Sequence, residues 1–498
     1  MEAGESRKQR IGIWLAPLLA LVVWLFADLD PADPRPTRMA AVAILMAGWW
    51  ISEAIPIPAT ALLPIALFPL MGIMPGRETA GVYFNHVIFL FIGGFLFAIA
   101  MERWQLHRRI ALRIILLFGT RPRRLLLGFM CATWLLSMWI SNTATAMMLA
   151  PMAVALLAQL EERHGPEKVA RYGVGLLIGI AYAASIGGLA TLIGTPPNLS
   201  FARIITIVFP DAPEISFARW MVFALPFSTV FLGVAWWVLA REHAGELEAE
   251  PADPATSKDE VRKAYAELGP ISYEERWVAL LFSLLVLGWT LRKFWVQLLP
   301  EPGHVDDGTV AIALALLFFL IPSRRAGEGR LLRWSDASKI RWGIVLLFGG
   351  GFALASGFKE SGLSDWLGQS LAGIEGMPPL LLILIICGGI TFLTELTSNT
   401  ATTEMILPVL GALAVAIGVN PLLLMIPATL SASCAFMLPV ATPPNAIIFG
   451  TGRVGMNQLV RSGLKLNLIG MVLITLWSYF ALPLVFGIES GVLPDWAK

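Results

Sequence analysis

Charged residues are scarce in this sequence. Of its 498 residues, 14% are Asp, Glu, Lys or Arg and 57% are hydrophobic, whereas soluble domains carry roughly 25% charge. An ordinary soluble protein is therefore excluded. The formal net charge is only +1, so the charge balance gives no indication of a nucleic-acid partner.

Reactive side chains are scarce as well. The three cysteines, Cys131, Cys387 and Cys434, lie in apolar stretches without metal-ligand spacing, and we expect them to be small core residues. None of the five histidines lies deep in an apolar stretch. Because the apolar stretches hold no constellation of nucleophile, base and metal ligands, we expect a protein that is not an enzyme and has no catalytic residues.

The sequence has instead many apolar stretches close to the roughly 20 residues that a spanning helix needs. The first, residues 11–26, follows the basic residues Arg7, Lys8 and Arg10. It resembles a signal peptide, but no small-residue cleavage site follows it, and we interpret it as the first span. The sequence thus predicts an all-α polytopic protein of the lipid bilayer.

Clusters of Lys and Arg orient the spans, because these residues accumulate in cytoplasmic loops. The basic N-terminus is placed inside. Three further spans are predicted near residues 39–54, 57–74 and 86–102, with an outside loop at 75–85. The last of them ends at a basic cluster, residues 103–124, in which residues 105–118 predict a helix at the cytoplasmic interface.

The rest of the chain continues this pattern. Residues 241–276, rich in Glu and Pro, are predicted to form a flexible cytoplasmic linker. A second basic cluster, residues 324–341, marks another inside loop, so the span at 342–358 begins inside. Counted in this way, the chain has about eleven spans, with its N-terminus cytoplasmic and its C-terminus periplasmic or extracellular.

Three blocks of sequence recur in the same order. Residues 91–98 match 348–355 and residues 141–145 match 398–402, both at an offset of 257, and Thr-Pro-Pro-Asn occurs at 195–198 and 442–445. The span that holds the first glycine block ends inside, whereas the span that holds its copy begins inside. The two halves therefore run in opposite directions, and such an inverted repeat is typical of secondary transporters.

Polar motifs interrupt the apolar stretches of both halves. The first Ser-Asn-Thr lies midway along residues 125–160, whose charged flanks are both placed inside, so this stretch predicts a re-entrant helical hairpin. Residues 379–418 repeat the hairpin from the other face. Thr-Pro-Pro-Asn ends one half-helix and begins another in each half. Four polar breaks are therefore expected to meet near the middle of the membrane.

The four motifs contain no Arg or Lys. Half-helix N-termini offer N–H groups and positive dipole ends to a carboxylate or another oxyanion, while hydroxyl, amide and carbonyl oxygens suit Na+. This combination favours cation-coupled binding of a small anion. A channel is disfavoured, because the motifs predict closed pockets rather than a continuous polar stripe.

Four acidic residues are candidates for a role in the membrane. Glu53 and Glu102 fall at predicted span ends, where a solvated carboxylate is the favoured interpretation. Glu395 and Glu404 flank the second Ser-Asn-Thr and correspond to methionines at the repeat offset. For these two, a paired structural carboxylate is favoured over a role in proton coupling.

Opposed Ser-Asn-Thr hairpins, each followed by a Thr-Pro-Pro-Asn break, resemble the divalent anion/sodium symporter family of di- and tricarboxylate carriers, over nearly the whole chain. The resemblance implies eleven spans plus two hairpins, a homodimer formed through a scaffold domain, and a transport domain that moves by an elevator-type mechanism in the cell inner membrane. The substrate-binding residues that it implies are Asn142, Thr143, Ser398, Asn399, Thr400, Thr195, Pro196, Thr442 and Pro443.

The resemblance also implies two sodium sites. The first consists of Ser137, Ser141, Asn142 and the backbone of Gly194, and the second of Thr394, Asn399 and the backbones of Thr397 and Ala441. Ser137 and Thr394 each lie four residues before the motif serine, a symmetry that the repeat shows by itself. Ala441 stands where the first half has Gly194, which is tolerable if only the carbonyl is used.

We therefore expect sodium-coupled uptake of C4 dicarboxylates such as succinate, malate and fumarate, with Na+ as the coupling ion. A sodium-independent dicarboxylate exchanger, or a carrier of tricarboxylate, sulfate or another oxyanion, remains an alternative. The expected organisation is N-terminal helices at 1–75, a first repeat at 76–240, the linker at 241–276, connecting helices at 277–341 and a second repeat at 342–498.

Overall fold

The computed structural model describes residues 7–119, 121–248, 256–371, 377–489 and 491–498. Across these residues the chain is all-α, as predicted, and an isolated β-bridge joins Pro322 and Arg330. Eight of the described helices are long and apolar enough to cross a membrane, or nine if one bent pair is counted as a single span. Four shorter apolar helices add to these.

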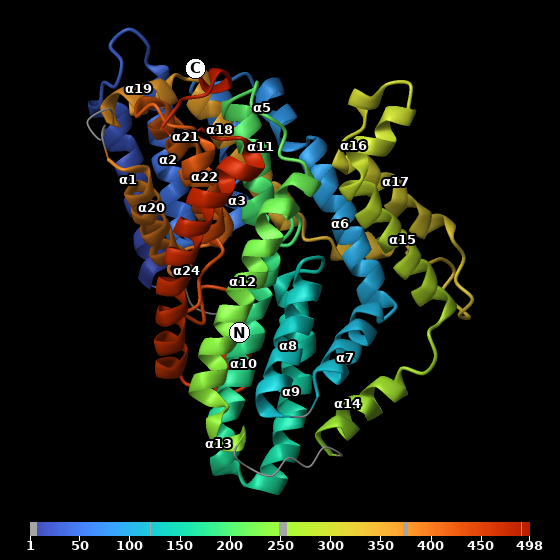
Figure 1. The fold of residues 1–498 in the computed structure, drawn as a ribbon. Coiled ribbons are helices and arrows are strands. Elements are labelled where there is room, and N and C mark those ends of the chain that lie inside the picture. The colour runs from blue at the N-terminus through green and yellow to red at the C-terminus, as the bar shows by residue number, and fades with distance from the viewer. Residues whose placement is uncertain (1–6, 120, 249–255, 372–376, 490) are drawn as a thin grey trace.

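The first half of the chain contributes twelve helices to the described structure (Figure 1). They are α1 (Arg7–Phe26), α2 (Arg35–Ser52), α3 (Ile57–Thr60), α4 (Leu63–Leu70), α5 (Gly76–Tyr83), α6 (His86–Arg103), α7 (Leu106–Phe118), α8 (Pro122–Ser137), α9 (Asn142–His164), α10 (Pro166–Gly188), α11 (Pro196–Val208) and α12 (Phe217–His243).

The remainder begins with short helices and continues into the second repeat. These helices are α13 (Gly245–Glu248), α14 (Thr256–Glu267), α15 (Tyr273–Thr290), α16 (Arg292–Trp295), α17 (Asp307–Leu320), α18 (Trp342–Glu360), α19 (Leu363–Leu371), α20 (Pro379–Thr394), α21 (Asn399–Ala416), α22 (Leu422–Ala432), α23 (Pro443–Gly450) and α24 (Met456–Phe486).

Both predicted hairpins and both predicted breaks are present. The first hairpin, α8–α9, occupies the lower part of Figure 1, and the second, α20–α21, occupies the upper part. Each turns at its Ser-Asn-Thr, because the helix that follows begins at the motif asparagine. Helices α10 and α22 end before Thr-Pro-Pro-Asn, and α11 and α23 begin at its first proline, where a missing N–H costs nothing.

Two segments that were expected to be loops contain helices. The predicted outside loop at 75–85 holds α5, whose Thr79 hydroxyl donates to the Pro75 carbonyl at 3.0 Å. The predicted flexible linker at 241–276 holds the end of α12, then α13 and α14, while its residues 249–255 lie outside the described residues. The loop at 75–85 was predicted only as the connection between two spans, and the linker from its Glu and Pro content, although its Ala, Glu, Lys and Arg residues favour a helix.

Helix α7 forms as predicted for residues 105–118, but one of its faces is buried in the protein. The buried Arg109 guanidinium donates to the Glu275 carboxylate of α15 at 2.8 Å and to the Gly269 carbonyl at 2.9 Å. A buried charge needs such a partner. The pair therefore ties α7 to the segment that leads into α15.

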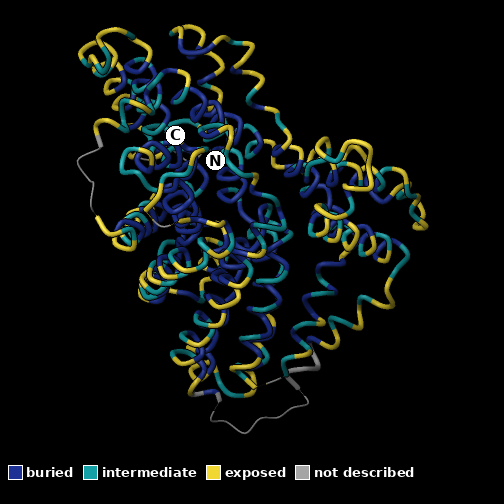
Figure 2. The backbone as a smooth tube through the Cα atoms, turned by 45° about the horizontal axis from the view of Figure 1, so that its top comes forward, coloured by how far each residue is buried: buried dark blue, intermediate teal, exposed yellow. Residues whose placement is uncertain are grey.

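Helix α10 is the most deeply buried of the long apolar helices described: 89% of its most apolar window is buried, compared with 17% for α1. The buried hydrophobic residues form two clusters, a large one and a smaller one that includes residues of α2, α4 and α18, and exposed residues are concentrated on the outer helices and loops (Figure 2). Small residues allow close helix contacts in membranes. A Cβ on Gly187 of α10 would lie 2.3 Å from the Trp134 carbonyl of α8, so this contact requires glycine.

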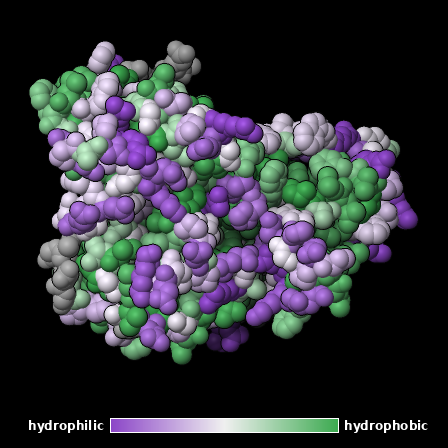
Figure 3. Space-filling view, turned by 90° about the horizontal axis from the view of Figure 1, so that it is seen from above, coloured by the Kyte–Doolittle hydropathy of each residue, from purple (hydrophilic) through white to green (hydrophobic). Residues whose placement is uncertain are grey.

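The surface has polar and apolar regions. Seen from above, polar side chains form an irregular band across the middle of the face, between apolar patches that include much of the outlying lobe (Figure 3). That lobe contains α15, α16 and α17, and α17 packs along α6 (Figure 1). Exposed apolar side chains on these helices, such as Leu287, Phe294 and Leu316, suit contact with lipid.

Candidate substrate and cation site

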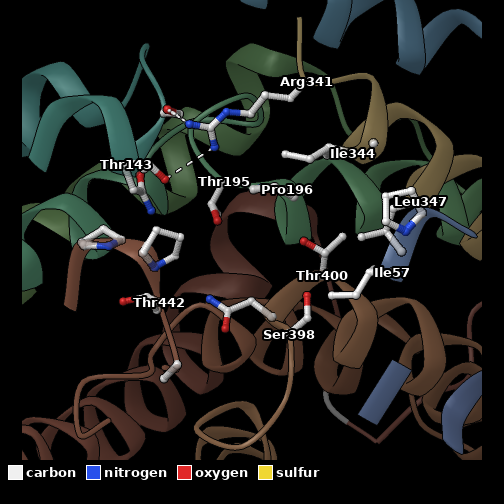
Figure 4. Close-up of a pocket in the computed structure, with 18 of the residues that line it drawn as sticks. Ile57, Thr143, Thr195, Pro196, Arg341, Ile344, Leu347, Ser398, Thr400 and Thr442 are labelled. Carbon is white, nitrogen blue, oxygen red and sulfur yellow. Dashed lines mark hydrogen bonds between the residues drawn. The ribbon is translucent and has the colours of Figure 1, made fainter. Parts of the chain in front are cut away.

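A cavity of about 820 Å³ lies where the two hairpin tips and the two broken helices meet. It is lined by both Ser-Asn-Thr motifs and by the start of both Thr-Pro-Pro-Asn motifs. Figure 4 shows Ser398 and Thr400 on the opposite side of the cavity from Thr143, with Thr195 and Pro196 between them. The residues predicted to bind substrate all line it: Asn142, Thr143, Ser398, Asn399, Thr400, Thr195, Pro196, Thr442 and Pro443.

The tip of the first hairpin is fixed by short hydrogen bonds. Ser141 is the N-cap of α9, and its hydroxyl accepts from the Ala144 N–H at 3.2 Å. The Ser137 hydroxyl lies within hydrogen-bond distance of both the Asn142 amide oxygen and the Ala184 carbonyl of α10, the latter at 2.8 Å. The first hairpin is thereby joined to the broken helix behind it.

The second hairpin repeats this arrangement. The Thr394 hydroxyl lies 2.7 Å from the Asn399 amide oxygen and 2.8 Å from the Ala432 carbonyl of α22. Ser137 and Thr394 do not line the cavity, whereas Asn142 and Asn399 do. Each hydroxyl therefore lies directly behind a cavity-lining amide.

The two helix breaks are also equivalent. The buried Asn198 amide donates to the carbonyls of Gly188 and Thr191, at 3.2 and 2.8 Å. The buried Asn445 amide donates to the carbonyls of Ala435 and Leu438, both at 3.1 Å. In each half the motif asparagine thus binds carbonyl groups that the unwound backbone leaves without helix partners.

Oxygen atoms cluster beside the first hairpin. A Cβ placed on Gly188 would lie 2.9 Å from the Asn142 amide oxygen and 3.0 Å from the Gly194 carbonyl oxygen, so these two oxygens face one small space that a larger residue would fill. Such hard, uncharged oxygen ligands suit an alkali cation. The remaining cavity-lining members of the predicted cation sites are Ser141, Thr397 and Ala441.

No group of three or more His, Cys, Asp or Glu side chains among the described residues is placed to hold a metal ion. The groups that the four motifs present to the cavity are hydroxyl, amide and carbonyl groups. This donor set differs from that of a zinc site.

Comparison with known proteins places the chain in a family. The family model described as the sodium:sulfate symporter transmembrane region matches residues 8–486. The chain belongs to this symporter family. The resemblance to divalent anion/sodium symporters is thereby confirmed, and the protein is a membrane transporter rather than an enzyme.

Individual relatives extend this result. The chain is 44% identical over 489 residues to the sodium-dependent dicarboxylate transporter SdcS of Staphylococcus saprophyticus, and 43% identical over 492 residues to SdcS of Staphylococcus aureus. Each match covers 97% of this chain and 93% of the relative. The crystal structure of the Alcanivorax borkumensis YdaH transporter has a similar fold, with a TM-score of 0.59, 15% identity, and coverage of 97% and 99% of the two chains.

Glu395 has a structural position in this symporter. Its buried carboxylate accepts from three consecutive backbone N–H groups, those of Phe436, Met437 and Leu438, at 2.7, 2.8 and 3.0 Å. The Asn467 amide of α24 donates to it at 2.7 Å. A structural carboxylate was expected at this position, but its partners are the amides of the unwound α22–α23 segment rather than a basic side chain.

The first half uses different groups at the same place. Met138 corresponds to Glu395, and its carbonyl accepts from the Thr191 hydroxyl at 2.6 Å. Thr191 corresponds in turn to Leu438, which donates to Glu395. The symporter therefore fastens each hairpin tip to its broken helix, once through a carboxylate and once through a hydroxyl.

Glu404 lies at a helix junction away from the cavity. It is fully buried, and one carboxyl oxygen accepts from the Ser200 hydroxyl of α11. The other has no hydrogen-bond partner among the described residues and faces Gly351 of α18, where a Cβ would lie only 1.9 Å from it. The expectation that Glu404 is a structural carboxylate is consistent with this packing. Its hydrogen-bond partner among the described residues is the Ser200 hydroxyl, however, and not a basic side chain.

Sequence reasoning missed Arg341. Because the four motifs lack Arg and Lys, the site was expected to be free of side-chain cations, but Lys8 and Arg341 both line the cavity. The Arg341 guanidinium also contacts the motif, since it donates to the Ser141 hydroxyl at 3.0 Å and to the Thr143 hydroxyl at 3.5 Å (Figure 4). The available signal was its place directly before the glycine-block span. It was instead counted among the basic residues that orient the loop.

Proposed function

We propose that the chain is a secondary active transporter that couples uptake of C4 dicarboxylates, such as succinate, malate and fumarate, to sodium. The name sodium-dependent dicarboxylate transporter, carried by relatives that are 43–44% identical over 93% of their length, supports this assignment. The single structural observation that carries it is the cavity shared by both hairpin tips and both helix breaks.

The proposed substrate ligands suit an anion with two separate carboxylates. Helices α11 and α23 begin at the cavity with Pro196 and Pro443, and helix N-termini attract negative charge. Asn142 and Asn399 face the cavity from opposite hairpins. We assign one substrate carboxylate to each hairpin, with the hydroxyls of the two motifs and of Thr195 and Thr442 completing the contacts.

The proposed sodium sites lie beside these ligands. In the first, the oxygens of Ser137, Ser141, Asn142 and Gly194 surround the cation, and in the second, those of Thr394, Thr397, Asn399 and Ala441 do so. Because Asn142 and Asn399 belong to both the cation and the substrate sites, each bound Na+ would orient an amide toward the anion and offset its charge. Coupling then follows from shared ligands, since each ion raises the affinity for the other.

The wider assembly is part of the same proposal. We assign the chain to the cell inner membrane as a homodimer, with a cytoplasmic N-terminus and a C-terminus outside. Residues 76–240 and 342–498 form the two repeats, and the connecting segments include the scaffold. The hairpins and broken helices would move against that scaffold in an elevator-type step, which carries the cavity from one face to the other.

Uptake of labelled succinate into proteoliposomes tests the proposal. We expect uptake that requires an inward Na+ gradient and is reduced by excess unlabelled malate or fumarate. Uptake that is independent of Na+ would indicate exchange. Stronger competition by citrate or sulfate than by malate would reassign the substrate to a tricarboxylate or another oxyanion.

A further inference from the structure

We propose that Arg341 is a further anion-binding residue. It binds a substrate carboxylate at one mouth of the cavity, and its hydrogen bonds to the hydroxyls of Ser141 and Thr143 are broken when the carboxylate binds. The inference rests on the proposed function and deepens it. It assigns to the transport cavity a charged side chain that the sequence motifs do not contain.

The geometry places the guanidinium at the edge of the predicted site, where Arg341 is exposed. Arg341 is the residue before α18, and its side chain extends along the edge of the cavity to the tip of the first hairpin (Figure 4). Its two terminal nitrogens donate to the hydroxyls of Ser141 and Thr143, at 3.0 and 3.5 Å. These residues lie on either side of Asn142, which also lines the cavity. The planar fork is therefore aimed at the place assigned to one carboxylate.

The present partners of Arg341 are weak ones for a cation. Among the contacts of the described residues, its hydrogen bonds go to two neutral hydroxyls. Burial lowers the pKa of the Arg341 guanidinium from its ordinary value, and the Glu102 carboxylate acts in the opposite direction. A guanidinium remains charged in proteins. Its charge is therefore available to an anion that enters the cavity.

Other basic residues of the same loop differ in this respect. Arg333 forms an ion pair with Glu328 at 3.0 Å, and Lys339 forms one with Asp336 at 3.4 Å. Within the described part of this loop, Arg341 is thus set apart by contacting the proposed substrate ligands.

Arrival of a dicarboxylate would change these contacts. Hydrogen bonds between a guanidinium and a carboxylate are charge-assisted, roughly twice as strong as neutral ones, and frequently bidentate. The carboxylate would therefore displace the two hydroxyls from Arg341. Ser141 and Thr143 would then be free to contact the substrate and Na+, so the exchange couples anion entry to completion of the site.

The first half of the chain has no charged residue at the position that corresponds to Arg341. Position 341 corresponds to Phe84 in the first half, at the offset of 257 that relates the glycine blocks. Phe84 carries no charge, and it is exposed. Since Arg341 lies outside the hairpin, a hairpin that moves across the membrane would leave it behind. We therefore infer that Arg341 affects substrate affinity from one face only.

The test measures succinate affinity separately at the two faces of oriented proteoliposomes, at saturating Na+. We expect Arg341→Gln to raise the apparent KM about tenfold at one face, equivalent to about 1.4 kcal/mol, with the KM at the other face within about twofold of wild type. Arg341→Lys keeps the charge but loses the fork, so we expect an intermediate KM at the affected face. Lys339→Gln removes the same charge from the same loop and should leave both KM values unchanged.

Several results would overturn the inference. Wild-type KM values at both faces in Arg341→Gln would exclude the contact, and an equal effect of Lys339→Gln would reduce it to long-range electrostatics. A misfolded Arg341→Gln is recognised by a lower unfolding temperature without substrate. In that case the KM of Arg341→Lys at the affected face is the test, and a wild-type value there would overturn the inference. Absence of succinate transport by the wild type would instead overturn the proposed function, and with it the assignment of Arg341 to a carboxylate.

Discussion

Ser137 and Thr394 make the same pair of hydrogen bonds in opposite halves of the chain. Each hydroxyl contacts the amide oxygen of the asparagine five residues later and a carbonyl at the end of the neighbouring broken helix, that of Ala184 or Ala432. The inverted repeat is therefore preserved in individual side-chain contacts. Those contacts lie at the two proposed cation sites.

Removing either hydroxyl tests the cation assignment. We expect Ser137→Ala and Thr394→Ala each to raise the Na+ concentration for half-maximal succinate uptake several-fold, because a hydrogen bond of this kind contributes about 0.5–1.5 kcal/mol. The measurement is uptake as a function of Na+ concentration. Ser137→Thr and Thr394→Ser keep a hydroxyl and serve as matched controls. Unchanged Na+ dependence in both alanine variants would remove these residues from the cation sites.

Asn142 and Asn399 are the residues that the proposal uses twice. We expect Asn142→Ala and Asn399→Ala each to reduce succinate uptake at least about tenfold, or about 1.4 kcal/mol, because each removes a ligand of both the anion and Na+. Expression and unfolding temperature should stay near wild type. Gln297→Ala, which removes an exposed amide, is the control. Retained uptake in either asparagine variant would contradict a shared site.

The hairpins and breaks were predictable because two independent patterns agreed on them. The offset of 257 matches residues 141–145 with 398–402, and the positive-inside charge pattern gives the two copies opposite directions. Proline then located the half-helix starts, since α11 and α23 begin at Pro196 and Pro443. These features depend on local sequence, and local sequence was sufficient to find them.

Contacts between distant segments were not predictable in the same way. Arg341 is 200 residues from Ser141 in the sequence, and the basic loop gave a topology but no direction for an individual side chain. Glu395 binds backbone amides 41 to 43 residues later, and backbone amides leave no signature in the sequence. Both residues could be recognised as charged from the sequence, but their partners are determined by the tertiary fold and could not be predicted from the sequence.

Glu395 is expected to be required for stability. Glu395→Ala would leave three N–H groups without their acceptor, that of Phe436 buried and those of Met437 and Leu438 partly buried. A buried donor that loses its partner costs about 1–3 kcal/mol. We expect a marked fall in the thermal unfolding temperature of the purified protein. Glu395→Gln keeps one acceptor oxygen and should be intermediate, while Glu301→Gln, at an exposed site, should have no effect. Wild-type stability in Glu395→Ala would show that water or a shifted side chain replaces the carboxylate.

The contact between Gly351 and Glu404 tests whether α18 and α21 must pack closely. A Cβ on Gly351 would lie 1.9 Å from a carboxyl oxygen and 2.5 Å from the Cγ of Glu404, and the buried Glu404 is held by Ser200. We expect Gly351→Ala to lower stability by about 1–3 kcal/mol, the usual cost of overpacking, as a reduced unfolding temperature. Gly389→Ala in α20 is the matched control, because no atom lies within 4 Å of its added Cβ. Equal behaviour of the two variants would mean that the α18–α21 interface yields without cost, and that this junction does not fix the second hairpin against α18.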